Sequence, residues 1–302
     1  MDGLLIIDKP EGLTSHDVVA RVRRILRTKR VGHTGTLDPF ATGVMVILVG
    51  RATRLAQFLD KDVKEYEALV RLGFETDSGD RTGSRNAEFG IRNEEIAKFL
   101  DKTDLDAVLE KFRGEIEQVP PMYSAKKIEG KKLYELARAG KVIERKPIKV
   151  TIHALELLSD EEIRDPRSAI RIRVVCSAGT YIRTLAGDIG KRLGTGAHLE
   201  ELRRTRSGKF GLSESITLDK LERLDDPDSA LRRMEEAVSE LPECVLPPDR
   251  VEKTKNGLST RFESAKITDG QAIRMLTDSG ELIAIGYYKG NEKVVQPKVV
   301  LL

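Results

Sequence analysis

The chain has 302 residues, of which 39% are hydrophobic and 33% charged; this is enough apolar material for a packed core and favours two domains over one. No stretch is apolar enough to span a bilayer, and the N-terminus lacks the basic-then-apolar layout of a signal peptide, so we expect a cytoplasmic protein. The net charge is only +3, and the two cysteines and four histidines have neither disulfide-framework nor zinc-ligand spacing, so we expect no metal site.

The first part of the chain alternates between short apolar segments and loops. Residues 3–8 and 44–49 are predicted strands. Thr14 and Asp17 have the spacing of a capping box, which predicts the start of an amphipathic helix. Residues 76–84 are polar and rich in glycine, so we expect a mobile loop there.

The rest of the chain continues this mixture. The further predicted helices lie at 55–59, 93–100, 104–113, 131–139, from 179 onward and at 199–203. The further predicted strands lie at 66–72, 149–158 and 169–177. An acidic, proline-punctuated region at 221–248 looks like a seam between domains, and residues 267–302 predict a small β-rich module.

Cations gather in three clusters although the net charge is small. Residues 21–30 hold six Lys and Arg with no acid, residues 124–150 hold nine against three Glu, and residues 203–209 hold four with no acid. Such clustering fits a phosphate-backbone footprint on one face. Solvated helix faces of a heat-stable protein rich in Glu, Lys and Arg explain the charges equally well.

Residues 32–43 place a single carboxylate, Asp38, among glycines and threonines. The spacing matches no glycine-rich phosphate motif, and no acidic neighbour stands between residues 30 and 59 to help hold Mg²⁺. A lone carboxylate that acts as nucleophile or base on an organic substrate remains open. A purely structural role, in which Asp38 caps the backbone of a turn, also remains open. The loop considered alone favours this structural role.

Further motifs accompany this loop along the chain. They are Asp8-Lys-Pro-x-Gly12, Tyr66 in Lys-Glu-Tyr-Glu, Pro120-Pro-Met-Tyr-Ser-Ala-Lys126, Tyr134-Glu-Leu-Ala-Arg-Ala-Gly140, Cys176-Ser-Ala-Gly-Thr-Tyr-Ile-Arg-Thr184 and Gly196-Ala-His-Leu-x-x-Leu-Arg-Arg204. In these segments the chain resembles the TruB-type tRNA pseudouridine-55 synthases, over essentially the whole first domain. The tail resembles, more loosely, a PUA module, which is an RNA-binding β-barrel.

The resemblance implies an isomerase that converts uridine 55 in the T arm of tRNA to pseudouridine without cofactor or metal. The N-glycosidic bond breaks, the uracil turns, and C5 bonds to the same sugar carbon. By this resemblance Asp38 is the essential catalyst. Tyr66 stacks on the uracil or transfers a proton at C5, and Arg183 pairs with Asp38 and keeps it ionised.

The resemblance also implies residues that bind the RNA. His33 is expected to fill the space of the extruded nucleotide, because the target base must leave a structured loop. Tyr181 and Leu202 are expected to line the uracil pocket, and Lys9 to support the fold beside it. A basic flap at about 124–150 is expected to close over the RNA. Its proposed RNA-binding lysines are Lys126, Lys131 and Lys132.

We therefore expect an α+β fold, with a mixed, largely antiparallel sheet flanked by helices in residues 1–240 and a small β-barrel-like PUA domain in residues 241–302. The expected partner is the T stem-loop of tRNA, with no membrane and no obligatory protein partner. A guide-RNA-dependent pseudouridylase of the same fold is one alternative, and the short C-terminal segment argues against it. A non-catalytic tRNA-folding chaperone is the other. Asp38, Tyr66 and Arg183 argue against it, since binding alone would not require a buried ionised pair.

Overall fold

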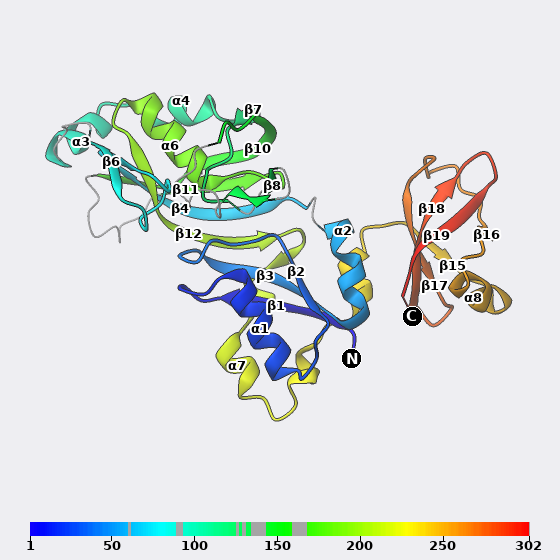
Figure 1. The fold of residues 1–302 in the computed structure, drawn as a ribbon. Helices are drawn as coiled ribbons and strands as arrows, with labels where there is room; N and C mark the ends of the chain where they lie inside the picture. Colours follow the sequence, from blue (N-terminus) through cyan, green and yellow to red (C-terminus); the bar gives the residue numbers. More distant parts are fainter. Residues whose placement is uncertain are drawn as a thin grey trace.

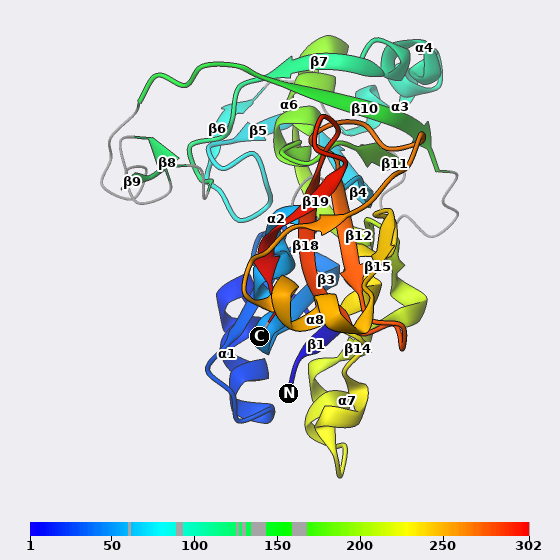
Figure 2. The same cartoon turned by 90° about the vertical axis from the view of Figure 1, so that its right-hand side faces the viewer.

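The computed structural model describes residues 1–59, 62–88, 93–124, 127–128, 131–133, 143–158 and 168–301. They form a large sheet with helices packed on it and a second, smaller sheet beside it (Figures 1 and 2). The helices are α1 (Ser15–Ile25), α2 (Ala56–Leu59), α3 (Asn93–Leu100), α4 (Leu105–Glu110), α6 (Ile182–Leu193), α7 (Leu218–Glu222) and α8 (Pro248–Lys255). Among these described elements none is long and apolar enough to cross a membrane.

The large sheet has ten strands. They are β1 (Gly3–Lys9), β2 (Val31–Thr34), β3 (Thr42–Val49), β4 (Lys64–Leu72), β7 (Gly114–Gln118), β10 (Ile148–Leu157), β11 (Ala169–Cys176), β12 (Ala197–Ser207), β13 (Phe210–Gly211) and β14 (Ile216–Thr217). Their order is β14-β1-β3-β12-β4-β11-β10-β7, with β2 on β3 and β13 on β12. The pairs β12–β3 and β1–β14 are parallel and the others antiparallel, so the predicted mixed, largely antiparallel sheet with helices is confirmed.

The short parallel contact between β12 and β3 joins the two halves of this sheet. Its partners are Arg203 with Thr42 and Arg204 with Gly43. A Cβ at Gly43 would lie 2.2 Å from the Arg204 carbonyl oxygen, and Gly43 has φ +104°, so only glycine fits here. The chain therefore enters β3 directly from the loop that carries Asp38, at the centre of the sheet.

Different helices cover the two halves (Figure 1). Helix α6 packs Leu185 and Ile189 into one cluster with residues of β4 and β11. Helices α1 and α7 pack against β1 and β3 through a second cluster that includes Val18 and Leu221. Helix α1 begins with the predicted capping box, in which the Thr14 side chain accepts from the Asp17 amide. These two packings fix the elements that meet at the Asp38 loop.

The smaller sheet has the order β15-β17-β18-β19-β16. Its strands are β15 (Glu243–Val245), β16 (Thr260–Arg261), β17 (Ala272–Leu276), β18 (Leu282–Lys289) and β19 (Val294–Val300). One hydrophobic cluster contains residues of both sheets, among them Leu4 and Leu48 from the large sheet and Ile285 and Val299 from the small one. The division into domains at residues 240 and 241 stays a prediction.

Several predictions of local structure are wrong. Residues 199–203 belong to strand β12 and not to a helix, because β12 is paired on both sides and its two bulges break the alternation that marks a strand. Residues 32–34 belong to β2 and not to the loop. Lys131 and Lys132 form β9, paired with β8 (Lys127–Ile128), and the rest of the predicted helix from 134 to 139 lies outside the described residues.

The segment at 76–84 is a loop, as predicted, and its mobility stays a prediction. It connects the two-stranded pair of β5 (Phe74–Thr76) and β6 (Arg85–Glu88), and it forms a hydrogen-bonded turn. Ser78 and Asp80 are buried in it. The polar composition that suggested mobility also supplies the side chains that hold the turn together.

Candidate active site

The loop that carries Asp38 is held by buried side chains from outside it. The Ser15 hydroxyl, at the first residue of α1, accepts from the Leu37 amide at 2.9 Å and lies 3.1 Å from the Leu37 carbonyl oxygen, to which it donates. Lys9, which is fully buried, donates from Nζ to the carbonyl oxygens of Pro39 (3.1 Å) and Ala41 (2.6 Å). Since both backbone neighbours of Asp38 are bonded in this way, the loop presents its carboxylate from a fixed backbone.

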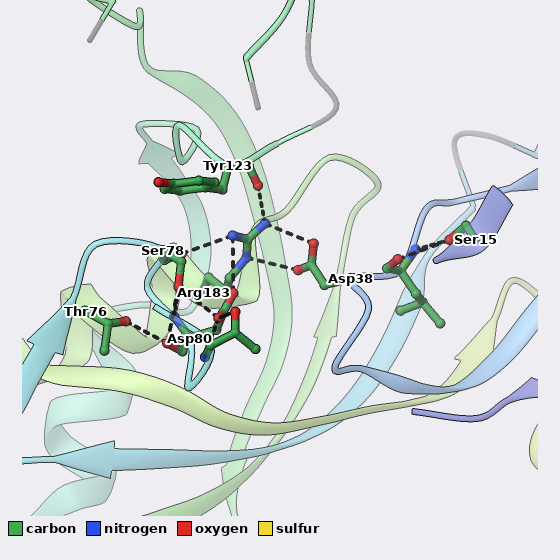
Figure 3. Close-up of polar contacts among 9 residues, drawn as sticks. Ser15, Asp38, Thr76, Ser78, Asp80, Tyr123 and Arg183 are labelled. Atoms are coloured by element: carbon green, nitrogen blue, oxygen red, sulfur yellow. Dashed lines mark hydrogen bonds and ion pairs between the residues drawn. The ribbon is translucent and has the colours of Figure 1, made fainter. Parts of the chain in front are cut away.

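Asp38 and Arg183 form the predicted ion pair (Figure 3). The guanidinium meets the carboxylate at two points, Nη2 to Oδ1 at 3.0 Å and Nε to Oδ2 at 3.0 Å. The Arg183 side chain is 6% exposed and that of Asp38 32%, so the carboxylate keeps an open side. Burial raises the pKa of the Asp38 carboxyl above its usual value, and Arg183 opposes that rise.

A second aspartate, Asp80, lies on the other side of Arg183 (Figure 3). Its Oδ2 is 3.5 Å from Arg183 Nη1, and its side chain is 5% exposed. The Ser78 hydroxyl and the Thr82 amide and hydroxyl donate to its Oδ1. The sequence prediction missed Asp80, because its partner stands about a hundred residues away, although the spacing of Asp80 and Thr82 is that of an Asx turn.

Two carbonyl oxygens complete the surroundings of the guanidinium. Nη1 of Arg183 donates to the Ser78 carbonyl at 3.0 Å, and Nη2 donates to the Tyr123 carbonyl at 2.7 Å. The guanidinium therefore joins the Asp38 loop, the 76–84 turn and the segment that follows β7. An arginine suits this position because its planar fork offers several donors in fixed directions.

The open side of Asp38 faces a cavity of about 250 Å³. The structure brings five of the predicted site residues to its wall, namely Asp38, Tyr66, Tyr181, Arg183 and Leu202. Lys64, Ser124, Arg204 and residues 177–180 also line it. Tyr66 stands opposite Arg204 in the β4–β12 register, and burial raises the pKa of its phenol while Arg204 opposes the rise.

The family described as TruB family pseudouridylate synthase (N terminal domain) matches residues 23–182, which is more than half of the chain. The chain belongs to the TruB family. The tRNA pseudouridylate synthase B C-terminal domain matches residues 183–251. The matched part therefore contains the loop, the cavity and most of the elements around them.

Individual TruB relatives agree with this assignment. The chain is 39% identical over 308 residues to tRNA pseudouridine synthase B of Bacillus subtilis (strain 168). This alignment covers 100% of the chain and 98% of the relative. The chain is 44% identical over 292 residues to the protein of the same name from Solibacter usitatus (strain Ellin6076), with 95% of each covered. A solved H/ACA RNP bound to a substrate RNA containing 2'-deoxyuridine contains a chain of the same fold, with a TM-score of 0.73 and 29% identity over 99% of this chain and 85% of that one.

Two predicted RNA-binding residues of this TruB protein lie away from the cavity wall. His33 is in β2, where its ring packs edge-to-face on His16 at 5.9 Å. Burial, with help from His16 and Arg204, lowers the pKa of His33 to about 4, so the ring is neutral at neutral pH. Lys9 is sealed under the loop, where burial lowers its pKa to about 8 despite the nearby Asp38.

The remaining predicted residues belong to the basic flap. Lys126 lies outside the described residues, and of Lys131 and Lys132 only the strand placement in β9 is described. In the described ranges, no three His, Cys, Asp or Glu side chains gather as a possible metal site. Among the groups at the cavity of this TruB enzyme are the carboxylate of Asp38, the guanidinium of Arg183 and the phenols of Tyr66 and Tyr181.

Such a set fits an isomerisation that moves only protons and one glycosidic bond. Pseudouridylate synthases convert uridine to its C5-linked isomer, so substrate and product have the same atoms. A carboxylate that is paired with a guanidinium can act as a nucleophile or a base. A phenol beside it can stack on a pyrimidine and exchange a proton.

Proposed function

We propose that this protein isomerises uridine 55 in the T arm of tRNA to pseudouridine, with Asp38 as the essential catalyst. The observation that carries the proposal is the two-point pair of Asp38 and Arg183, with the carboxylate facing a cavity lined by Tyr66, Tyr181 and Leu202. The names of the relatives from Bacillus subtilis and Solibacter usitatus support tRNA as the substrate.

The residues of the cavity divide the reaction among them. Asp38 acts at the sugar or the base as the bond from N1 to C1′ breaks, and Arg183 keeps it ionised and oriented. Tyr181 and Leu202 hold the freed uracil while it turns, and C5 then bonds to C1′. The proton on C5 leaves with the help of Tyr66, and N1 gains one, so the atoms balance.

The target base must leave the RNA loop before it can enter this cavity. Extrusion costs a few kcal/mol of stacking, which a side chain inserted into the loop can offset. His33 suits this role because its pKa of about 4 leaves a neutral, flat ring that can stack where the base was. The flap at 124–150 and the module at 241–302 would add contacts to the phosphate backbone.

The test is turnover of an unmodified tRNA transcript by the purified protein alone, followed by mapping of pseudouridine. We expect conversion at position 55 without any other RNA, protein or metal. The variant Asp38→Asn should lose at least about a thousandfold in rate, because it removes the one carboxylate that the described residues place at the cavity, and should bind the transcript within a few-fold of the wild type.

Each other outcome identifies an alternative. Turnover that appears only when a second RNA is added would support the guide-dependent enzyme. Binding and refolding of tRNA by the wild type without pseudouridine would support the chaperone. Unchanged turnover by Asp38→Asn would remove Asp38 from the chemistry.

A further inference from the structure

Gln118 is the last residue of β7, at the edge of the large sheet, and it is 1% exposed. Its side chain points to the start of α6, where it makes two hydrogen bonds with one residue. The side-chain oxygen accepts from the Tyr181 amide at 3.0 Å, and the side-chain nitrogen donates to the Tyr181 carbonyl at 3.3 Å. A buried carboxamide thus satisfies the Tyr181 amide and adds a second donor to the Tyr181 carbonyl, which also accepts from the Leu185 amide at 3.1 Å.

Tyr181 is the residue that needs such support. It is the N-cap of α6, has φ −100° and ψ 105°, and makes no capping hydrogen bond with its own side chain. Its ring lines the cavity, and Arg183 follows two residues later. The orientation of this one backbone unit therefore determines where both the ring and the guanidinium point.

Two neighbouring bonds join the same segments. Thr184 Oγ1 donates to the Val119 carbonyl at 3.3 Å, and Arg183 Nη2 donates to the Tyr123 carbonyl at 2.7 Å. Val119 and Tyr123 contribute backbone carbonyls to these bonds, whereas Gln118 contributes its side chain. A substitution can therefore remove its contribution and leave the backbone of residues 119–123 unchanged.

We propose that Gln118 is a positioning residue for pseudouridine formation. By fixing the backbone of Tyr181 it aligns Arg183 with Asp38 and sets the Tyr181 ring against the base. Gln118 is buried and is not itself among the residues that line the cavity. Its loss should consequently change the chemical step and leave RNA affinity unchanged. The kinetic part of this inference rests on the proposed tRNA substrate.

The main test compares Gln118→Met with Thr184→Val. Methionine keeps the length of the side chain and removes both hydrogen bonds, whereas valine keeps the shape of threonine and removes the Val119 bond at the same junction. We expect Gln118→Met to lower the single-turnover rate by about a hundredfold, the cost of a misplacement of about 1 Å, with the Kd for the transcript within about twofold. Thr184→Val should stay within about threefold of the wild type, since Tyr181 and Arg183 keep their contacts.

The pH profile provides a readout that loss of stability would not move. Arg183 lowers the pKa of Asp38 against the effect of burial. When Arg183 is less well aligned, the pKa of Asp38 rises and the acid limb of the rate profile moves to higher pH. An acid limb at the wild-type position would contradict the proposal.

Gln118→Glu gives a conditional rescue. A protonated glutamic acid can accept from the Tyr181 amide and donate to its carbonyl, whereas the carboxylate can only accept. The rate of Gln118→Glu relative to Gln118→Met should therefore rise as the pH falls. A ratio that is constant with pH would show that the two hydrogen bonds are not what the reaction needs.

Hydrogen exchange in the free protein tests the inference without any substrate. The Tyr181 amide should exchange at least about tenfold faster in Gln118→Met than in the wild type, because it loses its acceptor. Equal exchange would refute the proposed restraint even if the wild type proved inactive on tRNA, so this failure is distinct from failure of the proposed function. A single-turnover rate of Gln118→Met equal to that of the wild type would refute the proposal as well.

Discussion

Arg183 lies between two aspartates that look alike in sequence and differ in setting. Asp38 meets it at two points of 3.0 Å and is 32% exposed, whereas Asp80 meets it at one point of 3.5 Å and is 5% exposed. The Asp80 carboxylate accepts three further hydrogen bonds from its own turn. One carboxylate is therefore open to a substrate, and the other is enclosed as part of the support.

The difference has an electrostatic consequence. Burial raises the pKa of Asp38, Arg183 lowers it, and the charge of Asp80 raises it again. Asp80 thus holds the guanidinium in place and also weakens its acidifying effect on Asp38. A carboxylate that stays ionised but keeps some basicity is what a nucleophile or base requires.

Replacing the guanidinium of Arg183, which both aspartates share, should have the largest effect on the turnover rate. Arg183→Lys keeps the positive charge, but a lysine ammonium cannot reach both oxygens of Asp38 and the two carbonyls together. We expect the turnover rate to fall about a thousandfold, in line with the loss of preorganised donors. Circular dichroism checks the fold, and a rate near the wild-type value would mean that charge alone suffices.

The enclosed aspartate should matter less than the open one. Asp80→Asn keeps the shape but removes the charge that faces Arg183, so we expect about a hundredfold lower rate from the misplaced guanidinium. Loss of the Asp80 charge lowers the pKa of Asp38, whereas a misplaced Arg183 raises it, so the acid limb of the pH–rate profile of Asp80→Asn should lie at lower pH than that of Gln118→Met.

Asp77 provides the matched control for Asp80. It accepts from the Ser84 amide in the same turn and has no contact with Arg183. Asp77→Asn should stay within about twofold of the wild type. If both variants lost activity equally, the turn as a whole would be needed and the two-aspartate arrangement would have no separate role.

The support of the Asp38 loop should give the smallest of these effects. Ser15→Ala leaves both backbone groups of Leu37 without their partner, and we expect about a tenfold lower rate and about 1–3 kcal/mol lower stability. Thr14→Ala removes the adjacent helix cap, which costs about 1 kcal/mol, and does not touch the loop. Thermal unfolding and turnover of both variants separate stability from positioning, and equal rates would show that the loop does not need Ser15.

Features with a local sequence pattern could be predicted, and features that depend on contacts between distant segments could not. Five strands of the large sheet, namely β1, β3, β4, β10 and β11, follow from apolar or alternating runs, and the pairing of Asp38 with Arg183 follows from the family motifs. Strand β12 could not be predicted in this way, because two bulges break its alternation and its pairing partners lie in distant segments. Asp80 and Gln118 were not predicted for a related reason. Each contacts a residue at the start of α6 that is far away in the sequence, and neither has a local pattern that indicates this contact.

The cluster shared by the two sheets has a consequence for synthesis of the chain. Leu4 and Ile6 of the first strand pack in one cluster with Val299 and Leu301, and Arg51 donates to the Leu301 carbonyl. On the ribosome, this cluster cannot complete its packing until residues 299–301 have emerged. Until then its apolar side chains are less well covered and more accessible to chaperones.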